Sequence, residues 1–177
     1  MGEIPRSMAI VTSTTRGPSS TVTGTRSPSI GAPGGSEATT LTHRYDIVAH
    51  TADTGIETRG NTLAEAIGNA AFAMFDLMYD LSSVPATMSV AFDSTADSPP
   101  DLLVDVLSEL LLRSETNDVV FSEFRVQEAG MCAIVEAAGA TAVGWGLRGP
   151  PIKGVTYHRL TCEPAGDDWE IRVIFDV

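Results

Sequence analysis

The stretch TLAEAIGNAAFAMFDLM, residues 62–78, carries apolar side chains at helical spacing and predicts a helix with one apolar face. Thr62 is a favoured N-cap residue, and Glu65 three positions later completes a capping box. A second stretch, SPPDLLVDVLSELL at residues 98–111, has Ser98 as its cap, prolines in its first turn and leucines along one face. Two amphipathic helices therefore need an apolar surface against which both can pack.

The segments around these helices alternate apolar and polar residues, as strands do. We expect strands at 44–49, 56–59, 88–92, 121–127, 131–136, 140–147, 155–162 and 169–175, with turns at 53–55, Gly130 and 166–168. Two helices with a largely antiparallel set of strands predict an α+β fold. Both helices would pack on a largely antiparallel or mixed sheet in a single compact domain.

Residues 1–42 differ from the rest of the chain. They are rich in Ser, Thr, Gly and Pro and poor in large apolar residues, so we interpret them as a disordered tail and residues 43–177 as the domain. Three arginines with few acids also fit an organelle transit peptide. A plain disordered extension, or a start codon placed too early, is the simpler interpretation.

The domain is strongly acidic, since the 177-residue chain has a net charge of -12. Such a surface repels phosphates, which argues against direct nucleic-acid binding through a broad basic patch. It suits metal ions, a basic protein partner or simple solubility. No apolar run approaches the roughly 20 residues that span a bilayer. Cys132 and Cys162 lie in apolar runs, which indicates buried, reduced thiols in a cytoplasmic protein. We expect a monomer.

Two aspartates are the first candidates for chemistry. Asp53 lies in the polar run HTADTG, residues 50–55, where a turn residue is the simplest interpretation. Asp176 ends an alternating strand, and Val177 after it offers a main-chain carboxylate. Hard oxygen ligands of this kind suit Mg²⁺, Mn²⁺ or Ca²⁺ rather than zinc. The residues alone leave open whether Asp53 and Asp176 meet.

A lysine is the third candidate. Lys153 follows two prolines and could balance carboxylate charge or hold a phosphate, although a solvated loop lysine is the plainer interpretation. His158 follows five residues later on a predicted strand, where a structural role is equally reasonable. The sequence contains no P-loop, dinucleotide glycine fingerprint, nucleophile elbow or H-E-x-x-H motif.

Six segments occur in an order that resembles the archease family over residues 43–177. They are HTAD (50–53), FDLM (75–78), DLLVD (101–105), VFSEF (120–124), KGVTYH (153–158) and IFDV (174–177). One such tetrapeptide is a weak signal, whereas six in order form a specific one. The resemblance leaves the N-terminal tail out.

The resemblance implies a protein partner rather than a substrate. Archeases assist the RtcB-type tRNA-splicing RNA ligase, promoting guanylylation of the ligase's active-site histidine and multiple turnover. This chain would then be a non-catalytic protein cofactor. Asp53 and Asp176 fall on the family's metal-binding aspartates, for a divalent ion such as Ca²⁺, Mg²⁺ or Mn²⁺. Val177 falls on a further ligand, and Lys153 on the functionally important lysine.

One departure from the family concerns the loop before Lys153, which has only seven residues after Trp145 where many relatives carry a longer, more acidic loop. Two other functions stay open. The chain could be a chaperone-like binding module for an RNA-modifying enzyme such as a methyltransferase. It could also be a metal-dependent phosphohydrolase using Asp53 and Asp176, although no general base is evident.

Overall fold

The computed structural model describes residues 45–50 and 53–177, with residues 48–50 and Asp53 described by their backbone alone. In chain order the elements are β1 (Tyr45–His50), β2 (Asp53–Gly60), α1 (Leu63–Met78), the 3-10 helix η1 (Leu81–Ser83), β3 (Met88–Thr95), α2 (Pro99–Asn117), β4 (Val119–Ala129), β5 (Cys132–Thr141), β6 (Gly154–Ala165) and β7 (Asp168–Asp176). The segment interpreted as a tail, 1–42, lies outside the described residues.

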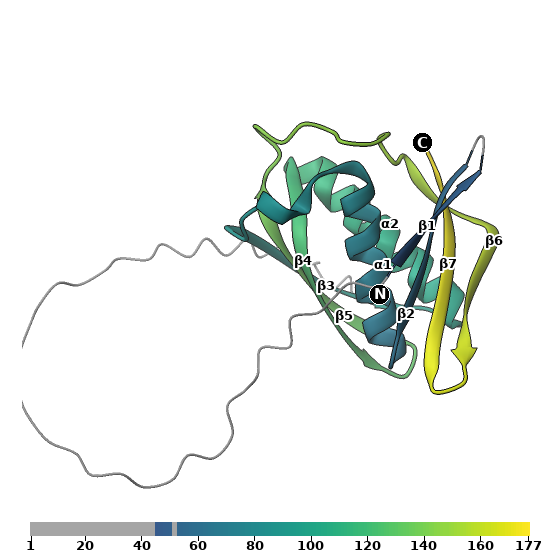
Figure 1. Ribbon diagram of the computed structural model, residues 1–177. Helices are drawn as coiled ribbons and strands as arrows, with labels where there is room; N and C mark the ends of the chain where they lie inside the picture. Colours follow the sequence, from purple (N-terminus) through teal and green to yellow (C-terminus); the bar gives the residue numbers. More distant parts are fainter. Residues whose placement is uncertain (1–44, 51–52) are drawn as a thin grey trace, which may run out of the picture.

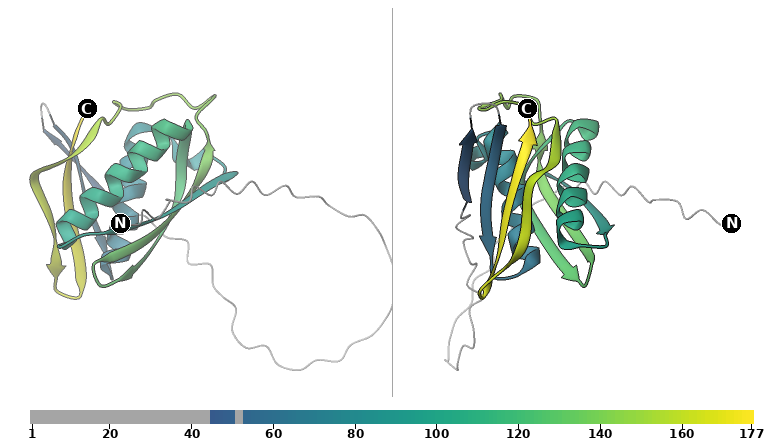
Figure 2. Two further views of the ribbon diagram at one scale, coloured as in Figure 1. Left: turned by 180° about the vertical axis from the view of Figure 1, so that it is seen from behind. Right: turned by 90° about the vertical axis from the view of Figure 1, so that its right-hand side faces the viewer.

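The strands form two sheets with the helices between them. One sheet has the order β1-β2-β7-β6 and the other the order β3-β5-β4. Every paired set of strands is antiparallel. Figure 1 and both views of Figure 2 show α1 and α2 between the two sheets. The predicted α+β fold is therefore confirmed, and the strands divide into two sheets that cover the helices from both sides.

The core lies where the helices meet the inner faces of both sheets. Helix α1 has small, fully buried residues on more than one side, and these let the neighbouring elements approach it closely: Ala66, Ala70, Ala71 and Ala73. Helix α2 contributes the fully buried leucines Leu102, Leu103, Leu107 and Leu110. Within the described residues, no helix combines the length and apolar character needed to cross a membrane.

Both helix starts follow the predicted capping chemistry. The Thr62 hydroxyl accepts a hydrogen bond from the Glu65 N–H at 3.1 Å. The Glu65 carboxylate in turn accepts from the Asn61 N–H at 2.8 Å, one residue before the position expected for a capping box. The Ser98 hydroxyl accepts from the Asp101 N–H at 3.4 Å at the start of α2. The bonds from Glu65 and Asp101 satisfy backbone donors that a helix leaves unpaired at its start.

Two predictions about strands were wrong. The turn expected at 53–55 is strand, because β2 begins at Asp53 and pairs with β1 and β7 along its length. The separate strands expected at 131–136 and 140–147 are one strand, β5, which ends at Thr141. The strand continues through the small residues between the two predicted segments, and at Gly139 the absent side chain makes room for the neighbouring β4 backbone.

Strand β1 is fixed to the end of α1 by a side-chain contact. The Tyr45 hydroxyl donates a hydrogen bond to the Asp76 carboxylate, joining residues 31 positions apart. Partial burial, this hydrogen bond and the nearby negative charge of Asp76 raise the pKa of Tyr45 to about 12. The contact holds β1, the edge strand of this sheet within the described residues, against the body of the domain.

We predict that Gly139→Ala destabilises the domain by about 3 kcal/mol, because the added Cβ would lie 1.9 Å from the Val120 carbonyl oxygen and force the β4 backbone away. Urea unfolding would measure the loss. The matched control is Gly146→Ala, where no atom lies within 4 Å of the added Cβ. Its stability should stay within about 0.5 kcal/mol of the parent. Equal effects of the two changes would contradict this account of Gly139.

We predict that Tyr45→Phe lowers the unfolding free energy by about 1 kcal/mol near neutral pH, because it removes the hydrogen bond to Asp76. A pKa raised from 10.0 to about 12 means that the Tyr45 contribution is complete below pH 10 and is lost as the pH rises towards 12. Urea unfolding of both proteins from about pH 8 to about pH 11.5 would test this. A difference that stays constant over that range would show that the Asp76 contact does not matter.

Candidate functional site

Strand β7 brings the predicted site residues to one end of the four-stranded sheet. It pairs with β2 on one edge, where Phe175 faces Thr54, and with β6 on the other, where Asp176 faces the first residue of β6. The Lys153 N–H donates to the Asp176 carbonyl oxygen at 2.7 Å. The backbone of Asp53, one residue before Thr54 on β2, lies at this same end. The Asp53 side chain is outside the described residues.

The last residues of β7 alternate between the two faces of the sheet. The Phe175 side chain is buried in the core, whereas the Asp176 side chain is exposed on the outer face. Lys153 is also exposed. Val177 is half-buried and packs against the hydrophobic core, which holds this end of the chain in place. The backbones of Asp176 and Lys153 are hydrogen-bonded, and both of their charged side chains are exposed to solvent.

The donor atoms at this end are hard oxygens: the Asp176 carboxylate and the main-chain oxygen of Val177. Among the described residues, no three His, Cys, Asp or Glu side chains lie close enough together to hold a metal ion by themselves. This donor set is unlike a zinc site, which has three or four nitrogen, sulfur or carboxylate ligands. It fits a hydrated Mg²⁺, Mn²⁺ or Ca²⁺ ion that takes its remaining ligands from water or from a partner.

His158 lies in a bulge of β6 and not at the paired end of the strand. The register of β6 on β7 shifts between Thr156 and Thr161. Inside this bulge His158 is exposed and its N–H contacts the Thr156 hydroxyl at 3.3 Å, while Arg159 has a φ of 53°. The structure therefore brings Lys153 to the end of β7 and leaves His158 apart from it.

Residues 142–153 form an extended segment, here called the strap, that crosses from one sheet to the other over the C-terminal end of α1 (Figure 1). The Arg148 and Gly149 N–H groups donate to the Met78 carbonyl oxygen at 2.7 and 3.3 Å. Ile152 is buried, and its N–H contacts the Met78 sulfur at 3.4 Å. These contacts pair a carbonyl that the helix end would leave open. The shortened loop is thus tied firmly to α1.

Two of the segments that carry the family resemblance contact each other. Tyr157 of β6 donates a hydrogen bond to the Asp101 carboxylate of α2 at 3.0 Å, although they are 56 residues apart. Hydrogen bonds from Ser98 and Tyr157 lower the pKa of Asp101. No sequence signal connects residues so far apart, so neither this contact nor the strap's anchors could be predicted.

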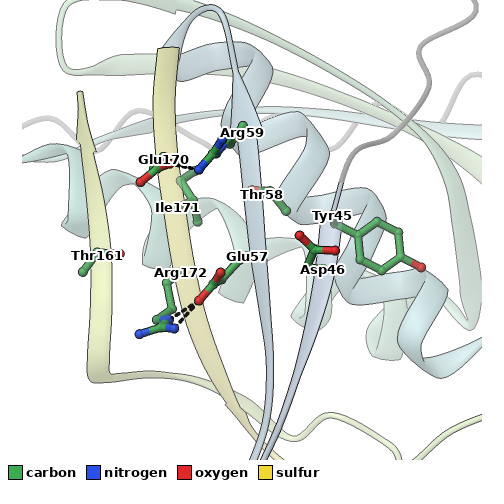
Figure 3. Close-up of a pocket in the computed structure, with 9 residues that line it drawn as sticks. All are labelled: Tyr45, Asp46, Glu57, Thr58, Arg59, Thr161, Glu170, Ile171 and Arg172. Atoms are coloured by element: carbon green, nitrogen blue, oxygen red, sulfur yellow. Dashed lines mark hydrogen bonds and ion pairs between the residues drawn. The ribbon is translucent and has the colours of Figure 1, made fainter. Parts of the chain in front are cut away.

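A shallow hollow occupies the outer face of the four-stranded sheet, over the middle of its strands (Figure 3). Two cross-strand ion pairs lie in it, Arg172 with Glu57 and Arg59 with Glu170. Both arginines are therefore neutralised by acids of this chain. Arg172 precedes Asp176 by four residues on the same strand, which is roughly 13 Å. The hollow and the end of β7 are separate places on one face.

The two cysteines are free thiols, as predicted. Cys162 is buried, but Cys132 is only partly buried, because it lies at the end of β5. Burial raises the pKa of Cys162 to about 12, so its thiol stays protonated and unreactive at neutral pH.

The chain matches known proteins over the domain just described. A model of the archease protein family matches residues 45–177. "Protein archease" of Methanosarcina acetivorans is 37% identical over 145 residues, covering 76% of this chain and 96% of that protein. "Protein archease" of Methanothermobacter thermautotrophicus is 33% identical over 131 residues, covering 72% of this chain and 94% of that protein.

Solved structures show the same fold. The solution structure of protein 1598 of Methanobacterium thermoautotrophicum has a TM-score of 0.65 at 28% identity, covering 76% of this chain and 99% of that one. A crystal structure from Thermotoga maritima, named as an archease and possible chaperone, has a TM-score of 0.55 at 22% identity and covers 73% and 94% of the two chains. The chain belongs to the archease family.

Proposed function

We propose that this protein is a non-catalytic activator of a tRNA-splicing RNA ligase. In this proposal it promotes guanylylation of the ligase's active-site histidine and so permits multiple turnover. The observation that carries it is the convergence at the end of β7, where exposed Asp176 and exposed Lys153 are joined through their backbones. The start of β2 brings the backbone of Asp53 to the same end. An exposed end of this kind can contact a partner's active site.

Each residue at this end has a distinct proposed role. Asp176, Val177 and Asp53 would hold a divalent ion through hard oxygens. Such an ion, when bound, neutralises phosphate charge and bridges phosphate oxygens. Lys153 adds a positive charge at the same end of the sheet, where it would contact a phosphate of the nucleotide or limit the repulsion between the acidic end and that phosphate. The ligase supplies the nucleophilic histidine, so this chain needs no general base of its own.

Two observations concern the cellular compartment and the alternative function. The free thiols of Cys132 and Cys162 suit a reducing compartment such as the cytoplasm. The name of the Thermotoga maritima protein suggests a chaperone for that relative. A chaperone-like module would hold its partner through a surface and would not need the Asp176 carboxylate. This difference separates the two functions experimentally.

We predict that Asp176→Asn, Lys153→Ala and Asp53→Ala each lower the stimulation of ligase guanylylation by about 10- to 100-fold, because each removes an ion ligand or the phosphate-facing charge. The measurement is transfer of labelled GMP from GTP to the cognate ligase, with and without this protein. Titration of Mn²⁺ by calorimetry gives a second reading, in which Asp176→Asn should bind more weakly.

The matched control is Asp167→Asn, which makes the same change on an exposed residue at the opposite end of the β6–β7 hairpin. It should leave stimulation and Mn²⁺ affinity unchanged. No increase in guanylylation with the parent protein would refute the activator proposal. Binding of the ligase that survives all three substitutions, without any stimulation by the parent, would instead support a chaperone-like module.

A further inference from the structure

The strap displays apolar side chains to solvent at the end of the molecule that carries the candidate site. Val143 is 76% exposed and Leu147 is 52% exposed. Between them Trp145 is half-buried and packs against the core. Figure 1 and Figure 2 show the strap and the C-terminal end of β7 at the same end of the domain. Exposed aliphatic residues on a segment that leads into a functional site suit a protein contact surface.

The backbone that presents these residues is held on both sides of them. The Ala142 N–H donates to the Asp118 carbonyl oxygen at 2.7 Å, and the Arg148 N–H donates to that of Met78 at the same distance. The strap then ends at Lys153, whose N–H bonds to β7. A surface whose backbone is already fixed loses little conformational freedom when a partner binds. The hydrogen bonds within the domain therefore preorganise the strap for binding a partner.

Two glycines of the strap stand clear of the rest of the described domain. Gly144 has a φ of +98°, and a Cβ added there would have no atom within 4 Å. The same space surrounds Gly146. The side chains of Val143 and Leu147, which neighbour these glycines, thus project from a part of the strap that the domain does not cover.

The strap also carries positive charge on an acidic protein. Four arginines elsewhere are neutralised by ion pairs with nearby glutamates: Arg59, Arg113, Arg125 and Arg172. Arg159 of β6 is also exposed and forms no such pair among the described residues. Arg148 and Lys153 are exposed, and neither forms an ion pair in the part of the chain that the structure describes. The charge of Arg148 acts on Asp80, but no described carboxylate lies within ion-pair distance of either cation. Val143, Leu147 and the two cations are therefore available to complementary groups of a partner.

This combination fits a protein surface better than a nucleic acid. Single-stranded RNA is bound through exposed aromatic rings and clustered cations, and the strap's aromatic residue, Trp145, is packed against the core. Val143 and Leu147 need an apolar hollow, and Arg148 needs an acid at its rim. We propose that the strap docks the protein onto an apolar hollow with an acidic rim on the RNA ligase, beside the ligase active site. This inference rests on the proposed activator function.

If the strap docks the protein, changes in the strap should alter the affinity for the ligase but not the maximal stimulation of guanylylation. The double variant Val143→Ser with Leu147→Ser should raise the protein concentration for half-maximal ligase guanylylation by at least about tenfold, because it removes the apolar anchors. Maximal stimulation at saturating protein should be unchanged, since the end of β7 is intact. Asp176→Asn should do the reverse and lower the maximum. Arg148→Glu should also raise the half-maximal concentration, more so at low salt.

Matched variants control for surface chemistry and folding. Leu112→Ser with Ile134→Ser removes two aliphatic side chains of similar exposure, 56% and 51%, from α2 and β5. Arg125→Glu reverses an exposed arginine on β4. Both should leave the half-maximal concentration unchanged. Urea unfolding of every variant should match the parent closely enough that all are folded in the assay.

The outcomes distinguish this inference from the function on which it rests. If the parent protein neither binds nor stimulates the ligase, both proposals fail. If the parent stimulates but the strap variant has the same half-maximal concentration, the docking role is wrong and the activator function stands. Sedimentation gives a third reading. A parent dimer that the strap variant converts to a monomer would assign the strap to self-association and overturn the inference.

Discussion

Strand β7 is hydrogen-bonded on both edges, and its apolar residues pack onto the helices between the two sheets. Pairing on two edges fixes the strand in register with β2 on one side and β6 on the other. The residues at its end cannot move without breaking one of these ladders. The positions of Asp176, Lys153 and the start of β2 therefore depend on how β7 is held.

The end of helix α1 lies at the same end of the domain as the end of β7. Helix α1 lies between the sheets, and its last carbonyl groups face the end of the molecule where β7 also ends. Those carbonyls need donors, and the strap supplies them through Arg148 and Gly149. A Cβ at Gly149 would lie 2.1 Å from the Leu77 carbonyl oxygen, so this close approach requires glycine. Capping of a helix thus also fixes the segment that leads to Lys153.

The end of the molecule therefore combines three kinds of surface. The Asp176 carboxylate offers hard oxygen, Lys153 and Arg148 offer positive charge, and Val143 and Leu147 offer apolar area. Elsewhere on the four-stranded sheet Arg59 and Arg172 are paired with glutamates across the strands. One end of this acidic domain is therefore suited to contact both a phosphate-rich site and the protein surface around that site.

The sequence by itself determined the two helices, their caps, the α+β class and the family, because caps and helical periodicity depend on residues three or four positions apart. It also indicated Asp53, Lys153, Asp176 and Val177 as candidates. Only the tertiary structure decided that the backbones of these residues lie at one end of a sheet. That arrangement requires strands more than a hundred residues apart to pair, as in the contact of Arg172 with Glu57. The extent of β5 and the course of the strap were likewise decided by neighbours distant in sequence, which local patterns do not encode.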